Sequence, residues 1–193
     1  MIVNVKTKLQ PMVFISHKSE DKVTAIKIKN RLSELGVNSF LDVVDLEHDL
    51  EPEELTNRLK LKMEESSDLL AVVSDVTEKS WWVPFEIGMA AHVNLPMVSF
   101  LKEGLVKKLP GYLRIWPSLS GIETLKAYAD QVKLRFVRDK HRWQEGRIIA
   151  DESVDEVFAT YSQLRTESST DVFYRDLNMA LSRHVTETSK RRE

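Results

Sequence analysis

Residues 12–36, MVFISHKSEDKVTAIKIKNRLSELG, decide the class of fold. The apolar run from Met12 to Ser16 stops at a polar cluster, which predicts a buried strand that enters a loop. Ile28, Leu32 and Leu35 then recur at helical spacing, and Gly36 is placed to end the helix. A strand, a helix and a glycine in this order are the opening of a βαβ unit.

The same alternation of strand and helix repeats along the chain. Two further apolar runs predict strands at Val37 to Leu41 and at Leu69 to Val73, the second of the kind covered on both faces. Pro52 suits the first turn of a helix between them, and Leu55, Leu59 and Met63 give that helix an apolar stripe. A fourth cycle runs from Ser80 to His92 and continues in a strand from Pro96 to Leu101.

A fifth strand is the hardest element to place, because two prolines and three glycines interrupt Lys102 to Gly121. Tyr112 to Ile115 is the candidate, and Ile122 to Phe136 then has the apolar spacing of a helix. Alternating strands and helices predict an α/β fold, a flavodoxin-like, doubly wound, five-stranded parallel sheet. We assign residues 1–11 to a lead-in and 12–137 to this domain.

Residues 138–193 are predicted to form a helical C-terminal extension. The charged stretch Arg138 to Gly146 has the composition of a connection. Two amphipathic helices should follow, one marked by Val154 to Leu164 and one by Phe173 to His184, with a turn at Thr166 to Thr170. Their apolar faces either pack on the core domain or provide a surface for self-association.

The composition is that of a soluble globular protein, with 42% hydrophobic and 30% charged residues. A net charge of -2 provides no broad attraction to nucleic acid or to an acidic membrane, so neither is an expected partner. The chain has no cysteine, which fits a reducing compartment, and no apolar run approaches the ~18 residues of a membrane span. We expect a cytoplasmic protein.

The sequence lacks the characteristic motifs of several enzyme classes. None of the six glycines forms G-x-G-x-x-G or a P-loop, and no G-x-S-x-G nucleophile elbow is present. The five histidines, at 17, 48, 92, 141 and 184, never occur at a close metal-ligand spacing. We therefore expect no metal site, no ATP hydrolysis and no serine triad.

Ligands of a doubly wound sheet bind outside the carboxyl ends of its strands. Three segments should therefore converge on one crevice: Ser16 to Asp21, Asp42 to Glu51 and Ser74 to Glu86. In the third, Pro84 is expected to begin the regular helix, which places Glu86 in its first turn, where the helix dipole favours an ionised carboxylate. These local features alone leave a second interpretation open, in which Glu86 is an ordinary acidic residue in the first turn of a helix and Trp82 is a core residue.

These residues resemble the TIR (Toll/interleukin-1 receptor) domain family over most of residues 12–137. VFISHKSEDK is similar to the first strand and loop of bacterial TIR domains, and SFLD at 39–42 is similar to the second strand. Ser74, Ser80, Trp82 and Glu86 match the family pattern S…S-x-W-x-x-x-E. The resemblance implies NAD cleavage with Glu86 as the catalytic glutamate, NAD+ being substrate rather than cofactor. It also implies that the dinucleotide site is lined by His17, Lys18, Ser19, Phe40, Asp42, Ser74 and Trp82.

Simpler interpretations stay open for the lining residues. Lys18 is either a pyrophosphate contact or only a solvated lysine. His17 is interpreted as a structural loop residue rather than a base, because the reaction needs no base. Ser19, or Asp21 two residues later, can serve as a helix cap. Asp42 and Ser74 are as well suited to hydrogen bonds within their loops as to a ligand.

The loop after the second strand departs from the family. TIR domains commonly carry a glycine there, whereas this chain runs VVDLEHDLEPEE, without glycine. Because this loop takes part in assembly in the family, the acidic version implies a different partner surface.

Three functions remain as hypotheses. The first is an NAD+ glycohydrolase or cyclase that releases nicotinamide and leaves ADP-ribose or a cyclic ADP-ribose-type signal, in bacterial antiviral defence. Homo-oligomers through TIR surfaces and a separate sensor or effector protein are its expected partners. The second is a TIR scaffold or adaptor without chemistry, and the third is an enzyme similar to nucleoside deoxyribosyltransferases.

Overall fold

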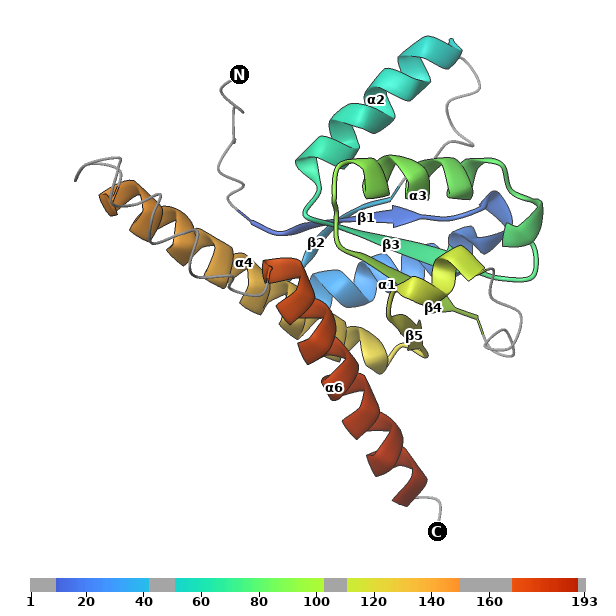
Figure 1. The fold of residues 1–193 in the computed structure, drawn as a ribbon. Coiled ribbons are helices and arrows are strands. Elements are labelled where there is room, and N and C mark those ends of the chain that lie inside the picture. The colour runs from blue at the N-terminus through green and yellow to red at the C-terminus, as the bar shows by residue number, and fades with distance from the viewer. Residues whose placement is uncertain (1–9, 42–50, 103–110, 150–167, 191–193) are drawn as a thin grey trace.

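The computed structural model describes residues 10–41, 51–102, 111–149 and 168–190. Its centre is one parallel sheet of five strands in the order β2-β1-β3-β4-β5 (Figure 1). The strands are β1 (Met12–Ser16), β2 (Asn38–Leu41), β3 (Asp68–Val73), β4 (Met97–Leu101) and β5 (Ser118–Ser120). The predicted doubly wound, flavodoxin-like class is confirmed.

Helices cover both faces of this sheet (Figure 1). One face carries α2 (Pro52–Glu65) and α3 (Trp82–His92). The other carries α1 (Lys22–Glu34), α4 (Thr124–Ile149) and α6 (Ser169–Lys190). Short 3-10 helices η1 (Ser19–Asp21), η3 (Thr77–Lys79) and η4 (Gly111–Ile115) lie in the connections. None of the helices in the described ranges is long and apolar enough to span a membrane.

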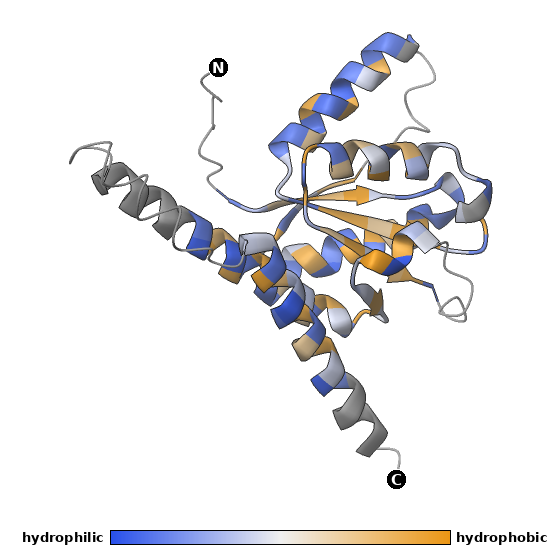
Figure 2. Cartoon of the chain, in the orientation of Figure 1, coloured by the Kyte–Doolittle hydropathy of each residue, from blue (hydrophilic) through white to orange (hydrophobic). Residues whose placement is uncertain are grey.

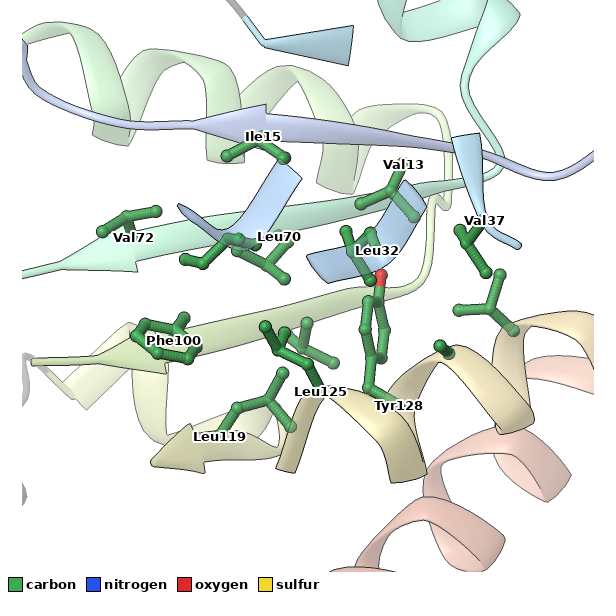
Figure 3. Packing of buried hydrophobic residues seen from close by; sticks show 14 of the residues in the cluster. Val13, Ile15, Leu32, Val37, Leu70, Val72, Phe100, Leu119, Leu125 and Tyr128 are labelled. Carbon is green, nitrogen blue, oxygen red and sulfur yellow. The ribbon is translucent and has the colours of Figure 1, made fainter. Parts of the chain in front are cut away.

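Alternation along the strands divides the core into two layers. In β3 all six residues are buried, with Leu70 and Val72 facing α1 and α4, and Leu69 and Ala71 facing α2 and α3. Figure 3 shows the first layer, where strand residues meet Leu32, Leu125 and Tyr128. In Figure 2 the strands are mostly apolar, whereas the flanking helices also carry hydrophilic stretches.

The first helix follows the sequence prediction closely. Ile28 and Leu32 are fully buried, as their spacing predicts. Gly36 has φ of 74°, a left-handed conformation that glycine adopts without steric cost, and it follows the helix end. The predicted cap by Asp21 is wrong: Asp21 occupies the cap position but makes no capping hydrogen bond, because its carboxylate is used elsewhere.

The predicted last strand at Tyr112 to Ile115 is also wrong. These residues belong to the 3-10 helix η4, and β5 lies further along, at Ser118–Ser120, where it pairs with β4. Leu113 and Trp116, three residues apart, both pack against the core, whereas Tyr112 and Ile115 are exposed. This three-residue period matches one turn of a 3-10 helix rather than the two-residue period of a strand.

The predicted connection at Arg138 to Gly146 is helical. It forms the second half of α4, which runs beyond the sheet (Figure 1), so this part of the helix has no apolar stripe to reveal it. The predicted helix at Phe173 to His184 is confirmed as part of α6. Phe173 and Leu177 are buried in the core of the sheet domain, so α6 packs on the core.

Two sequence predictions fall outside the described residues. They are the helix marked by Val154 to Leu164 and most of the glycine-free loop Asp42 to Glu51. The division at 137/138 stays a prediction, although α4 runs through that position without a break.

Candidate functional site

The strand order defines where a ligand site is expected. The connection from β1 leads to α1 on one face of the sheet, whereas the connection from β3 leads to α3 on the other. Because β1 and β3 are neighbours, the chain departs in opposite directions at their carboxyl ends. This is the topological switch point, at which doubly wound folds bind their ligands. Two groups of polar side chains meet there, one on each face.

The first group contains Glu86, whose predicted position needs correction. Helix α3 begins at Trp82 rather than near Pro84, so Glu86 is its fifth residue and lies beyond the first turn. The start is earlier because Ser80 Oγ accepts a hydrogen bond from the Val83 amide at 3.2 Å. Pro84 does not interrupt the helix, since the first four amides of any helix lack helical partners.

Ser16 holds the Glu86 carboxylate. Ser16 is the last residue of β1, and its hydroxyl donates a short hydrogen bond to Glu86 Oε2. Both residues are 0% exposed. This contact fixes the Glu86 carboxyl group beside the end of β1.

The second group is centred on Asp21, which begins the approach to α1. The Ser74 hydroxyl, just after β3, donates a short hydrogen bond to Asp21 Oδ2. The Lys102 ammonium, just after β4, lies 3.0 Å from Asp21 Oδ1. Asp21 is 1% exposed, whereas the Lys102 side chain is 44% exposed. The buried carboxylate therefore ties together the ends of three strands and holds a cation at the surface.

Ser74 is also held from its own loop. Its amide donates to Thr77 Oγ1 at 2.8 Å, and Thr77 is buried in η3. This arrangement corresponds to the loop-bonding alternative of the sequence analysis, and a ligand contact by Ser74 stays a prediction.

Aromatic side chains near this edge differ strongly in exposure. The Phe40 ring is half-buried, 5.4 Å from the Phe14 ring, with Lys62 Nζ 5.6 Å from its centre. The Trp82 ring is half-buried against the core and lies 5.4 Å from the Phe85 ring. Trp81, which precedes α3, is 94% exposed. Of the aromatic side chains described at this edge, the most accessible is therefore that of Trp81, which the sequence analysis left out.

The loop after β1 carries three other predicted residues. Lys18 Nζ lies 2.8 Å from Glu20, and this hydrogen bond lowers the pKa of the Glu20 carboxyl. His17 is half-buried, and Ser19 is exposed as the first residue of η1. Asp42 falls outside the described residues. Among the residues that the structure describes, no three histidine, aspartate or glutamate side chains lie close enough together to hold a metal ion.

Sequence reasoning missed three residues of these groups: Ser16, Asp21 as a carboxylate partner, and Lys102. Side chains alternate along β1, so Ser16 points to the same face of the sheet as Phe14, the face covered by α3. This alternation could have identified Ser16 from the sequence. Lys102 directly follows an apolar strand, as strand-end ligand residues do. The pairing of Asp21 with Lys102 had no signal in the sequence, because 81 positions separate them.

Comparison with known proteins identifies the family. A family model described as a TIR domain matches residues 13–131. No curated protein matches the chain. Among solved structures, the chain is similar to a 3-dehydroquinate dehydratase-like protein from Bifidobacterium longum, with 12% identity and a TM-score of 0.40, over 64% of this chain and 96% of that one. A similarity this low says nothing about activity. The family match spans more than half of the chain, and the chain therefore belongs to the TIR domain family.

Proposed function

We propose that this TIR domain cleaves the bond between nicotinamide and ribose in NAD+, with Glu86 as the catalytic carboxylate. The observation that carries the proposal is the position of Glu86 at the switch point of the sheet, bonded to the Ser16 hydroxyl. Membership of the TIR family, which the resemblance in sequence associates with NAD cleavage, supports it.

The chemistry suits a site with one carboxylate. The bond between the anomeric carbon of ribose and the ring nitrogen breaks, and its electron pair stays on nicotinamide, which leaves neutral. No general acid is needed for this step. The ribose becomes an oxocarbenium-like cation, which a preorganised carboxylate stabilises by charge and by accepting hydrogen bonds from ribose hydroxyls. Attack by water gives ADP-ribose and one proton, whereas attack by a nitrogen of the adenine gives a cyclic product.

The complete burial of Glu86 adds a requirement to this function. At 0% exposure the carboxylate has no route to a ribose, so the site must open before substrate binds. We propose that self-association of TIR domains provides the opening. Trp81, 94% exposed and one residue before the helix that carries Glu86, is a candidate contact in such an assembly. In the cell, the product would act in bacterial antiviral defence, alone or through a separate sensor or effector protein.

The same burial favours a second candidate function, that of a scaffold which assembles without chemistry. In a scaffold, Glu86 and Ser16 would only link α3 to β1, and Trp81 would belong to the assembly surface. The two candidates share a surface and differ in whether the buried carboxylate ever meets a substrate.

Chromatography of products separates these functions. The full chain is incubated with NAD+ at concentrations that favour oligomers, and the mixture is resolved for nicotinamide, ADP-ribose and cyclic derivatives. If the chain is a glycohydrolase or a cyclase, nicotinamide should appear in an amount equal to that of ADP-ribose or of a cyclic derivative. A scaffold predicts unchanged NAD+ even in the oligomer, which would overturn the proposal. An enzyme similar to deoxyribosyltransferases would instead exchange bases between deoxynucleosides and leave NAD+ intact.

A further inference from the structure

We propose that Lys102 binds the pyrophosphate of the dinucleotide and that Asp21 positions it. This inference rests on the proposed function for the identity of the substrate. It assigns the phosphate-binding role to a residue outside the loop after β1.

The Lys102 ammonium is held by a buried anchor. Asp21 Oδ1 accepts one of its three N–H donors at 3.0 Å, and Asp21 Oδ2 is occupied by the Ser74 hydroxyl. The Lys102 backbone is fixed as well, since its amide donates to the Val73 carbonyl at 3.0 Å. With backbone and ammonium both held, the cation loses little further freedom when an anion binds it.

Lys102 and Glu86 flank the carboxyl edge of the sheet from opposite faces. Glu86 and Ser16 lie on the face that α3 covers. Ser74 and Lys102 continue the strand alternation of Val72 and Phe100, which places them on the α1 face together with Asp21. The chain from Ser16 to Asp21 links the two groups, and its five residue steps limit the distance between these two backbone positions to about 17 Å.

In the proposed binding mode, an extended dinucleotide spans both groups. A ribose at Glu86 on one face leaves the pyrophosphate to cross the edge of the sheet toward the other. Lys102 there is 44% exposed and presents donors to solvent, whereas Asp21 beneath it is 1% exposed. A lysine ammonium acts toward a phosphate as a point charge with rotatable donors, which tolerates the changing geometry of a flexible pyrophosphate.

Lys18 is the competing cation, and its environment is less suited. The Lys18 side chain is 24% exposed, but its partner Glu20 is 51% exposed, so the anchoring carboxylate of this ion pair lies in solvent. Exposed pairs of this kind fix a side chain only weakly. Lys102 is anchored instead to a buried carboxylate that also binds Ser74.

Binding of ADP-ribose, measured by calorimetry on the full chain, tests the proposal without requiring turnover. ADP-ribose carries the pyrophosphate, and adenosine, which has no phosphate, serves as the reference ligand. The variants are Lys102→Met and the matched control Lys126→Met, which removes an exposed lysine paired with Asp130 on α4. Because Lys102→Met leaves Asp21 buried without its cation, the double variant Asp21→Asn/Lys102→Met is measured as well.

The expected result is a loss of ADP-ribose affinity of about ten- to a hundredfold in both Lys102 variants. Adenosine affinity and the Lys126→Met variant should stay unchanged. The KM for NAD+ should rise in parallel, with a smaller change in kcat.

The outcomes separate this inference from the proposed function. If NAD+ is cleaved while Lys102→Met retains wild-type ADP-ribose affinity and KM, the assignment of Lys102 is overturned and the function stands. If ADP-ribose binds in a manner dependent on Lys102 but NAD+ is never cleaved, the function fails and the phosphate site stands. Absence of any ADP-ribose binding by the wild-type chain, at concentrations that favour oligomers, also overturns the assignment.

Discussion

The Arg135 guanidinium in α4 donates to Asp68 Oδ2 at 2.6 Å, at the edge of the sheet opposite to Glu86. The two side chains are 10% and 1% exposed. Arg135 also donates to the Ser67 carbonyl at 3.0 Å, and its guanidinium carbon lies 5.2 Å from the centre of the Phe173 ring of α6. One residue thus joins β3, α4 and α6 at the amino edge, away from the predicted chemistry.

Replacing Arg135 by Met should lower the free energy of unfolding by about 3 to 5 kcal/mol, because Asp68 would stay buried without its cation. Urea unfolding followed by circular dichroism measures this change. Lys126→Met, which breaks an exposed pair in the same helix, is the control and should cost at most about 1 kcal/mol. A loss for Arg135→Met no larger than that of the control would contradict the structural role given to the pair.

Truncation of Phe173 tests whether α6 belongs to the folded core. Phe173 is 1% exposed in the cluster that also contains Tyr128, so Phe173→Ala should destabilise the chain by about 3 to 5 kcal/mol. Met179 lies six residues further along α6 at 47% exposure, and Met179→Ala should change stability by less than about 0.5 kcal/mol. Equal thermal denaturation midpoints for the two variants would show that α6 is not docked in solution.

Tyr128 predicts how stability depends on pH. The pKa of the Tyr128 hydroxyl is raised well above its ordinary value of 10.0, mainly because the group is completely buried and secondly because of the negative charge of Asp68. In the unfolded chain the hydroxyl ionises near that ordinary value, so above it the unfolded state binds fewer protons than the folded state. The free energy of unfolding should therefore fall as pH rises past 10.

The variant Tyr128→Phe isolates this contribution. Within the described residues the Tyr128 hydroxyl has no hydrogen-bond partner, so its removal should cost little near pH 7. Urea unfolding between pH 8 and pH 11, a range set to bracket the ordinary tyrosine pKa of roughly 10, should show a shallower decline for the variant than for the wild type. Parallel curves would mean that Tyr128 does not contribute to the pH dependence.

Ser16→Ala should lower kcat for NAD+ cleavage by about tenfold. The reason is that the Glu86 carboxyl group loses the hydroxyl that holds it in place. Ser99→Ala, which removes another buried serine from within the sheet, is the matched control and should leave kcat unchanged. An unchanged kcat in Ser16→Ala would show that the Ser16 contact plays no part in the chemistry.

Most of the sheet was predictable because its longer strands are short apolar runs that end in polar loops. β1, from Met12 to Ser16, agrees with the prediction at both ends. β5 was misplaced because three residues, Ser118–Ser120, are too few to show a period. The second half of α4 was missed because it extends beyond the sheet and needs no apolar stripe.

The candidate site was predictable at the level of segments. Strand-end reasoning brought the loop after β1 and the segment before Glu86 together, and the contact of Ser16 with Glu86 lies between them. The partners themselves were not predictable. Lys102 reaches Asp21 across 81 positions, and only the strand order brings β4 close enough for that contact.

The release of nicotinamide from NAD+ by the wild-type chain, compared with Glu86→Gln, tests the central claim most directly. Gln keeps the shape of the side chain and an acceptor for the Ser16 hydroxyl but removes the charge. Glu53→Gln, at an exposed position in α2, is the control. The account predicts a rate lower by about a hundredfold or more in Glu86→Gln, with equal thermal stability and an unchanged control. Nicotinamide release at the wild-type rate from Glu86→Gln would contradict it.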